Sequence, residues 1–423
     1  MIELLVVSFL LLMLIGVPLG ACMILASIVF IATSGRLPLE VVPQQVFHGL
    51  DQFTWLAIPL FMLAGELMNR GGITNRLVNC IQAFVGHFRG GLAHVSVITN
   101  VVMAGISGSA LADAAGTGSV LIPAMKRAGY STPFAAAVIS AASTCGPIIP
   151  PSIPFILYGT LSGVSVGKLF AAGALPGFAM AASFMIIIAI IGRKYGLPKE
   201  ERKSVREALR ALGQASLALV MPVIVLGGIL LGVFTATEAA GVAVVYALIV
   251  SVLIYREVKI HDLFEIALDA AKSASIIMFA IGAAGLLSWV INFSQVAYTL
   301  STLLTAITTS GTMMLLLITA LLLILGCFME ATPLIIILTP VLLPVTTKLG
   351  IDPIHFGLVM VMVLMIGLVT PPVGMLLFIT GGIGEVSILS VARASIPFMI
   401  GILVVTLLII LFPGWALWLP SLI

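Results

Sequence analysis

The chain has 423 residues, of which 61% are hydrophobic and only 8% are charged, with a net charge of +3. Soluble globular domains carry about 25% charged residues, so this composition excludes a protein whose whole surface faces water. Apolar runs of roughly 17–25 residues, long enough to cross a bilayer as helices, recur along the chain. The four cysteines lie far apart, which indicates neither a disulfide framework nor a CxxC metal site.

In chain order, the first half (1–192) contains five predicted spans at 2–16, 17–33, 53–69, 131–163 and 168–192. The first apolar run starts at Met1 without a basic stretch, so we expect a retained span rather than a cleaved signal peptide. Two shorter apolar segments, separated by small residues, predict a re-entrant helical hairpin at 92–126. The hairpin enters the membrane and returns on the same side.

A basic segment at 193–216 links this half to the second half (217–423). The second half contains predicted spans at 217–234, 237–255, 273–293, 353–385 and 393–413, and a second hairpin at 312–347. The predicted fold is therefore an all-α polytopic membrane protein with about ten spans and two hairpins.

An internal repeat supports this division. A shift of 221 residues places Gly105 on Gly326, and it places the double proline Pro150-Pro151 on Pro371-Pro372. Matches between single glycines arise easily by chance, but a double proline inside two apolar runs does not. Transporter halves often retain weak internal symmetry of this kind, and an odd number of spans per half inverts the second half.

The basic residues provide an independent test of this topology. With both termini outside, 16 of the 19 Lys and Arg residues fall inside, and only Arg36, Lys168 and Lys348 fall outside. Such a bias is typical of bacterial inner-membrane proteins. We therefore expect periplasmic termini, a cytoplasmic linker at 193–216, and hairpins that open to opposite sides.

The first hairpin and the fifth span carry the first group of candidate residues. The hairpin tip reads Gly105-Ile-Ser-Gly-Ser-Ala110, in which Ser107 and Ser109 could ligate a cation. The span contains four prolines at 147–154, and prolines remove backbone donors and break a helix. Broken backbone at membrane depth is tolerated where it lines a cavity or is buried in protein, and its carbonyls suit sodium.

The second half repeats this arrangement, with a tip at 326–333 and a break at 370–374. Two hairpin tips facing two broken spans predict a central site with two flanking cation sites. The alternative is that the small residues only pack helices and the prolines only kink them. Asp113 and Glu330 lie beside the tips, where an acid could bind a ligand or cap a helix. For Glu66, with Arg70 four residues later, we expect a structural ion pair.

These motifs resemble the large membrane subunit (DctM type) of the tripartite ATP-independent periplasmic (TRAP) transporters, over essentially the whole chain. The matching elements are Gly105-Ile-Ser-Gly-Ser-Ala-Leu-Ala-Asp113, Pro147-Ile-Ile-Pro-Pro-Ser152, Thr237-Glu-Ala-Ala-Gly241, Thr332-Pro333 and Thr370-Pro-Pro-Val-Gly374. The resemblance implies a scaffold and a mobile transport domain that moves like an elevator, driven by sodium, and the import of an organic acid such as a C4-dicarboxylate or sialic acid.

The resemblance also implies the site residues and the partners. Sodium ligands would be Ser107, Ser109, Gly146, Pro147, Pro150, Gly326, Glu330, Thr332, Thr370 and Gly374, and substrate contacts would be Gly108, Asp113, Pro151, Ser152 and Pro372. The expected partners are a separate four-span membrane subunit (DctQ type) and a periplasmic substrate-binding protein (DctP type). Neither an organic cofactor nor a nucleic-acid partner is expected.

Two other functions compete with this one. A stand-alone ion-coupled carboxylate carrier could share the fold. An intramembrane serine protease could use Ser107, because Gly105-Ile-Ser-Gly108 matches a GxSG pattern, but it would need a histidine base such as His94. A primary pump is disfavoured because the sequence has no GxxxxGK[ST] loop. The particular acid, the sodium stoichiometry, the ligating atoms and the oligomeric state stay open.

Overall fold

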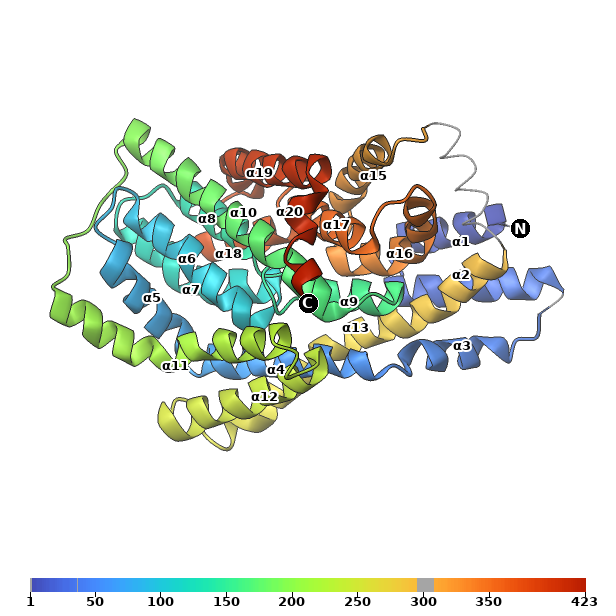
Figure 1. Cartoon of the computed structure of the whole chain (residues 1–423), viewed down its shortest axis with the longest axis horizontal. Helices are drawn as coiled ribbons and strands as arrows, with labels where there is room; N and C mark the ends of the chain where they lie inside the picture. Colours follow the sequence, from blue (N-terminus) through green and yellow to red (C-terminus); the bar gives the residue numbers. More distant parts are fainter. Residues whose placement is uncertain (1, 36, 295–307) are drawn as a thin grey trace.

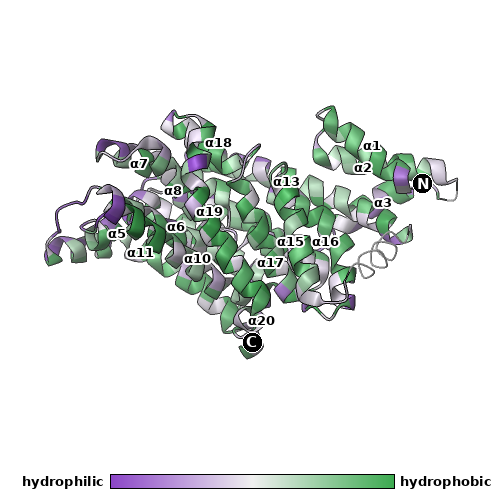
Figure 2. Cartoon of the chain, turned by 90° about the horizontal axis from the view of Figure 1, so that it is seen from above, coloured by the Kyte–Doolittle hydropathy of each residue, from purple (hydrophilic) through white to green (hydrophobic). Residues whose placement is uncertain are grey.

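The computed structural model describes residues 2–35, 37–294 and 308–423. All regular secondary structure in these residues is helical, which confirms the predicted all-α class. Helices with apolar faces dominate the structure, and hydrophilic residues gather at the end that carries α5, α7 and α11 (Figure 2).

The helices of the first half are α1 (Ile2–Leu14), α2 (Leu19–Ser34), α3 (Val41–Leu50), η1 (Phe53–Leu56), α4 (Ala57–Arg70), α5 (Ile73–Val85), α6 (Gly91–Ser107), α7 (Ala110–Arg127), α8 (Thr132–Ser143), α9 (Ile153–Ser162) and α10 (Val166–Tyr195). The predicted hairpin 92–126 is the pair α6 and α7, and the predicted broken span 131–163 is the pair α8 and α9.

The helices of the second half are α11 (Val205–Leu230), α12 (Ala236–Leu248), η2 (Ile249–Ile254), α13 (Asp262–Phe293), α15 (Gly311–Gly326), α16 (Ala331–Lys348), α17 (Pro353–Leu368), α18 (Met375–Gly384), α19 (Ile388–Leu411), α20 (Pro413–Leu417) and η3 (Pro420–Leu422). The second hairpin is the pair α15 and α16, and the second broken span is the pair α17 and α18.

Length and composition identify six helices that could each cross a membrane among the described residues: α10, α11, α12 with η2, α13, α16 and α19. The count rises to seven if α3 and η1–α4, which meet at a bend of 61°, form one span. Several other apolar helices, including α1, α2 and the halves of both broken spans, have only 10–17 residues. The broken spans are therefore built from short helices joined end to end.

The helix bounds follow the 221-residue shift closely. Shifted by this amount, α7 begins and ends at the same positions as α16, and α8 begins where α17 begins. The halves differ at α3 and α4, which together correspond to the single helix α13. The indole Nε1 of Trp55 donates to the Gly49 carbonyl at 2.9 Å across the bend between α3 and α4.

The basic linker is partly helical. α10 ends at Tyr195, and α11 begins at Val205, inside the predicted linker 193–216. The reason is a capping box, in which Ser204 and Glu207 bond to each other's backbone N–H. These hydrogen bonds from the Ser204 hydroxyl and backbone also hold the pKa of Glu207 below its usual value.

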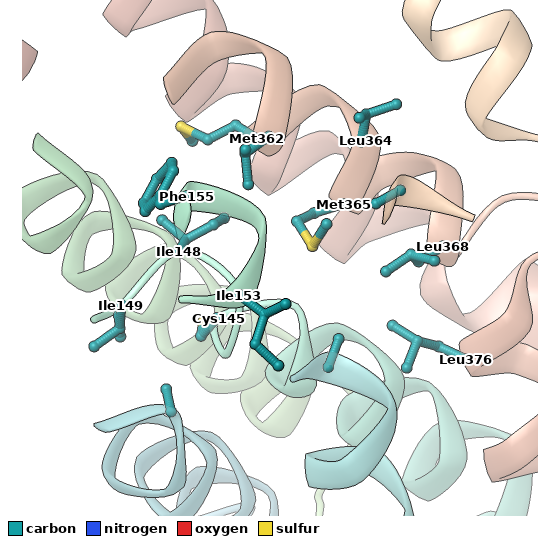
Figure 3. Close-up of a cluster of buried hydrophobic side chains, with 14 of the residues drawn as sticks. Cys145, Ile148, Ile149, Ile153, Phe155, Met362, Leu364, Met365, Leu368 and Leu376 are labelled. Carbon is teal, nitrogen blue, oxygen red and sulfur yellow. The ribbon is translucent and has the colours of Figure 1, made fainter. Parts of the chain in front are cut away.

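The helices form two groups, the hairpins with the broken spans and a second group that packs against them. We call α2, α3, α4, α12 and α13 the framework helices: α4 packs on α12, while α2, α3 and α4 pack along α13. Figure 1 shows α13 running beside α2 and α3, with the hairpins and broken spans on one side of them. One part of the extensive core lies between the two broken spans, where Ile148, Ile153 and Phe155 lie close to Met362 and Met365 of α17 (Figure 3).

Candidate functional site

The tip of the first hairpin brings two hydroxyls and a carboxylate together. α6 ends at Ser107, Gly108 takes a left-handed conformation with φ +62°, and Ser109 is the N-cap of α7. The Ser107 hydroxyl donates to Asp113 Oδ1 at 2.5 Å, and the Ser109 N–H donates to Ser107 Oγ at 3.3 Å. The turn thus aims its polar atoms at the first turn of α7.

Asp113 is the most unusual residue of this tip. Its side chain is fully buried, and its Oδ2 atom has no hydrogen-bond partner among the described residues. A buried ionised carboxylate is costly unless a cation or hydrogen bonds compensate it. A small cation beside Oδ2 would supply that compensation.

The first broken span lies directly against this carboxylate. A Cβ atom added to Gly146 would stand 2.5 Å from Asp113 Oδ2, so the carboxylate contacts the backbone at that point. In the described structure, the carbonyls of Gly146 and Pro150 accept no backbone N–H. Both double prolines, Pro150-Pro151 and Pro371-Pro372, contain a cis peptide bond. The site therefore combines a carboxylate with unpaired carbonyls, which are hard oxygen ligands.

The broken span and the hairpin tip are fastened to each other. The Ile153 N–H donates to the Gly108 carbonyl at 3.4 Å. A Cβ atom at Gly108 would lie 2.7 Å from the Pro151 carbonyl oxygen, so only glycine fits there. Ser152 caps α9 by accepting the Phe155 N–H at 3.2 Å, and its hydroxyl donates to the Pro147 carbonyl.

In the second half, the hairpin and the broken span are held together by backbone packing, and no carboxylate of the described residues takes part in these contacts. A Cβ atom at Gly367 would lie 2.5 Å from the Gly326 carbonyl oxygen, so α15 and α17 touch backbone to backbone. The Val373 N–H donates to the Cys327 carbonyl at 3.1 Å. The Thr370 hydroxyl donates to the Ile366 carbonyl, four residues earlier, at 2.6 Å. Its proton is therefore already used in a local hydrogen bond.

A central cavity of about 360 Å³ lies between the two hairpin tips. Its polar lining consists of Glu66, Ser109, Ser273, Glu330 and Thr332, and its apolar lining includes Met62, Ile153, Ile276, Ile277, Met365 and Leu368. The framework helices α4 and α13 contribute Glu66 and Ser273. The volume falls within the range of small-molecule sites, which also combine apolar walls with a few polar groups.

Three helix N-termini border this cavity. Its lining includes Ala110–Ala112 at the start of α7, Ile153 and Pro154 at the start of α9, and Ala331 and Thr332 at the start of α16. The helix dipole makes such ends favourable for anions. At the start of α9 the Ile153 and Phe155 N–H groups are already donated and Pro154 has none, so the free N–H groups come from the starts of α7 and α16. Among the described lining residues there is no lysine, arginine or histidine. An anion bound here would therefore be held by helix ends and hydroxyls.

Comparisons with known proteins decide the family. Residues 6–415 match the family described as "Tripartite ATP-independent periplasmic transporter, DctM component". The chain belongs to the DctM family. It is 36% identical to the sialic acid TRAP transporter large permease SiaM of Vibrio cholerae, covering 96% of this chain and 95% of that protein. It is 39% identical to the C4-dicarboxylate TRAP transporter large permease DctM of Pseudomonas aeruginosa, covering 89% of this chain and 88% of that one.

A solved structure supports the fold alone. The YdaH transporter of Alcanivorax borkumensis superposes with a TM-score of 0.65 at 16% identity, covering 95% of this chain and 97% of that one. That structure has an unusual topology. The DctM chain is therefore a multi-pass membrane protein with a transporter fold, and the predicted family resemblance is confirmed.

The structure separates the expected site residues of the DctM chain into three groups. Gly108, Ser109, Pro147, Glu330 and Thr332 line the central cavity, while Ser107 and Asp113 line a smaller cavity next to it. Gly146, Pro150, Pro151 and Ser152 are buried in the first break. Gly326, Thr370, Pro372 and Gly374 surround the second break and line neither cavity, and Pro372 is exposed.

The two halves carry different chemistry at equivalent positions. Under the 221-residue shift, Ser107 falls on Phe328 and Asp113 falls on Leu334. Among the described residues of the two tips, Asp113 is a fully buried carboxylate, whereas Glu330 at the second tip is partly buried. A cation site in the second half would depend on carbonyls and on Glu330 or Thr332. The serine-protease alternative has no geometric support. His94 and Ser107 lie thirteen residues apart on helix α6, which puts them about 20 Å from each other.

Sequence reasoning missed the contribution of the framework helices. Glu66 was expected to pair with Arg70, and this ion pair is present at 4.0 Å, although Arg70 lies closer to Asp269, at 2.5 Å. Glu66 also lines both cavities, as does Ser273. A polar residue inside an apolar helix was the available signal, but only the tertiary packing shows which of these residues face the hairpins.

Proposed function

We propose that this DctM permease imports a small carboxylate by sodium-coupled symport. The observation that carries the proposal is the central cavity, which lies between both hairpin tips and is bordered by three helix N-termini. The buried carboxylate of Asp113 lies beside the same hairpin tip. The cavity supplies a site for an anion, and the carboxylate with the neighbouring carbonyls supplies a site for a cation.

The substrate class follows from charge. Helix N-termini favour a carboxylate group, and hydroxyls of Ser109 and Thr332 could bind further oxygens of the solute. Glu66 and Glu330 also line the cavity, so a bare anion would be repelled. Co-bound sodium ions would offset that repulsion. Two of the curated relatives, SiaM of Vibrio cholerae and DctM of Pseudomonas aeruginosa, carry sialic acid and C4-dicarboxylate in their names, which agrees with this class.

The proposed movement is of the elevator type. The hairpins and broken spans would move as one body against the framework helices, carrying the solute between hairpin tips. The cavity supports this division, since one wall comes from α4 and α13 and the other from the tips. Sodium and solute would bind together, because the cations reduce the negative charge that the solute meets.

Partners and location follow from the family. We infer that the permease acts in the bacterial inner membrane with a small four-span subunit (DctQ type) and a periplasmic substrate-binding protein (DctP type), as the word tripartite implies. Uptake that needs no binding protein would instead favour the stand-alone carrier.

The sodium requirement can be tested directly. We expect uptake into proteoliposomes that contain both membrane subunits, with the binding protein and candidate acids outside, to need an inward sodium gradient. Replacing sodium by choline at a fixed membrane potential should abolish uptake, because choline is too large for oxygen sites of this size. Uptake that continues unchanged in choline would refute sodium as the coupling ion.

The orientation gives a second test. We propose that both termini are periplasmic and that the segment from Arg193 to Arg210 is cytoplasmic, because basic residues concentrate there. Single cysteines placed near Ile423 and at Lys203 should react with a membrane-impermeant reagent from opposite sides. Labelling of both from the same side would contradict the inverted arrangement.

A further inference from the structure

A small cavity of about 50 Å³ lies beside Asp113, where the first hairpin meets the framework helices. This volume holds about one small ion with a water molecule. Its polar lining comes from both sides: Glu66 and Asn69 on α4, Ser273 on α13, and Ser107, Ser109 and Asp113 on the hairpin. Among the described lining residues there is no basic side chain.

Two carboxylates, Glu66 and Asp113, line this cavity, and Arg70 lies beside Glu66. Arg70 is the nearest basic group to Glu66, but three acids compete for it: Asp269 at 2.5 Å, Glu265 at 3.8 Å and Glu66 at 4.0 Å. Lys272 also lies nearest Asp269, at 3.7 Å. Arg70 is thus committed to Asp269, and the Glu66 charge facing the cavity is only weakly compensated.

Two further groups in the lining have unused hydrogen-bonding capacity. Asp113 is fully buried, and its Oδ2 atom has no partner in the described structure. The Ser273 hydroxyl makes no hydrogen bond within the described residues, whereas Ser275, two residues later on α13, donates to the Ala271 carbonyl at 2.7 Å. Carboxylate and hydroxyl oxygens are the groups that a hard cation prefers.

We propose that this cavity is a further sodium site, shared between the framework helices and the first hairpin, with Glu66 and Ser273 as its framework ligands. It shares Asp113 with the site at the first broken span and differs from that site by the oxygens that α4 and α13 contribute. The inference rests on the sodium coupling proposed above. It adds ligands from the framework helices to those from the hairpins and broken spans.

The shared site has a mechanical consequence. A sodium ion held by Glu66 and the hairpin tip joins the two groups of helices, so the hairpin can leave this position only when the ion departs or passes to Asp113. Binding of the ion at the site formed by Asp113 and the first broken span would then release the contact between the hairpin and the framework helices. Glu66 and Ser273 should therefore influence sodium affinity although neither belongs to a hairpin or a broken span.

Matched variants of the full-length protein test this site. Glu66→Gln removes a proposed ligand, and its control Glu265→Gln also loses a neighbour of Arg70 but lines neither cavity. Ser273→Ala removes the second ligand, with Ser275→Ala as its control. Thermal unfolding is followed with increasing sodium chloride at constant total chloride, balanced by choline chloride. Sodium-dependent uptake is measured alongside.

We expect Glu66→Gln and Ser273→Ala to raise the sodium concentration at half-maximal stabilisation, by about tenfold for the carboxylate and about threefold for the hydroxyl, and both controls to match the unmodified protein. If Glu66→Gln shifts no further than Glu265→Gln, or if Ser273→Ala leaves the midpoint unchanged, the shared site is refuted while sodium coupling stands. An unmodified protein that sodium fails to stabilise would refute the coupling itself.

Discussion

Asp113→Asn should greatly weaken the sodium response of this protein while leaving its fold intact. The substitution keeps the shape of the side chain, and the amide oxygen can still accept the hydrogen bond that Ser107 donates at 2.5 Å. What it removes is the negative charge beside Gly146. Without sodium, that buried charge destabilises the protein, so the variant should unfold at the same temperature or a higher one than the unmodified protein.

With sodium present, the order should reverse. Sodium at one hundred times its dissociation constant stabilises a single-site protein by about 2.7 kcal/mol, and the variant should lose most of that gain. Sodium-driven uptake should fall below detection. Ser119→Ala, on the exposed face of the same helix, is the control for general damage to α7. A variant that keeps the normal sodium-induced rise in melting temperature would show that Asp113 has a structural role only.

The ends of the helix pair α6 and α7 could be predicted from sequence because local chemistry fixes them, while the re-entry of the pair into the membrane stays a prediction. The predicted segment 92–126 agrees with α6 and α7 to within one residue at each end. Gly90 and Gly108 adopt left-handed conformations at the helix boundaries, and Ser109 caps the following helix. Such turn and cap residues act within a few positions of the chain, so they can be recognised from the sequence alone.

Two of the framework helices, α13 and α3, were predicted less well than the other three. The predicted span 273–293 is only the second part of α13, which starts at Asp262 with a charged surface that hydropathy alone excludes. α3 was not predicted as an element, because it is short and only moderately apolar. Its identity as a partner of α13 depends on backbone contact between Gly49 and Gly285, where a Cβ at Gly285 would lie 2.8 Å from Gly49 Cα.

The candidate site shows the same limit. Motifs identified the tips and breaks, but they suggested two equivalent sites, whereas the buried Asp113 has Leu334 as its counterpart. The role of Glu66 was hidden, because its spacing to Arg70 suggested an ion pair within one helix. The competing Asp269 lies 199 residues from Arg70 in sequence, and no local pattern reports such a partner.

Gly367→Ala should damage the second half far more than its small size suggests. The added methyl group would lie 2.5 Å from the Gly326 carbonyl oxygen and 2.7 Å from Gly326 Cα. These are backbone atoms of α15, so no side chain can rotate away, and the hairpin must shift from α17. Overpacking of this kind costs about 1–3 kcal/mol, against a gain of about 1 kcal/mol from replacing a helical glycine by alanine.

The neighbouring glycines provide graded controls for this prediction. A Cβ at Gly326 would lie 3.3 Å from Gly367 Cα, a milder contact, and a Cβ at the exposed Gly382 would meet nothing within 4 Å. We expect the melting temperature to fall most for Gly367→Ala, less for Gly326→Ala, and to hold or rise for Gly382→Ala. Because Gly367 precedes the break at Thr370 by one turn, the sodium midpoint should also rise in Gly367→Ala. Equal melting temperatures for the Gly367 and Gly382 variants would mean that α15 is not held against α17 by this backbone contact.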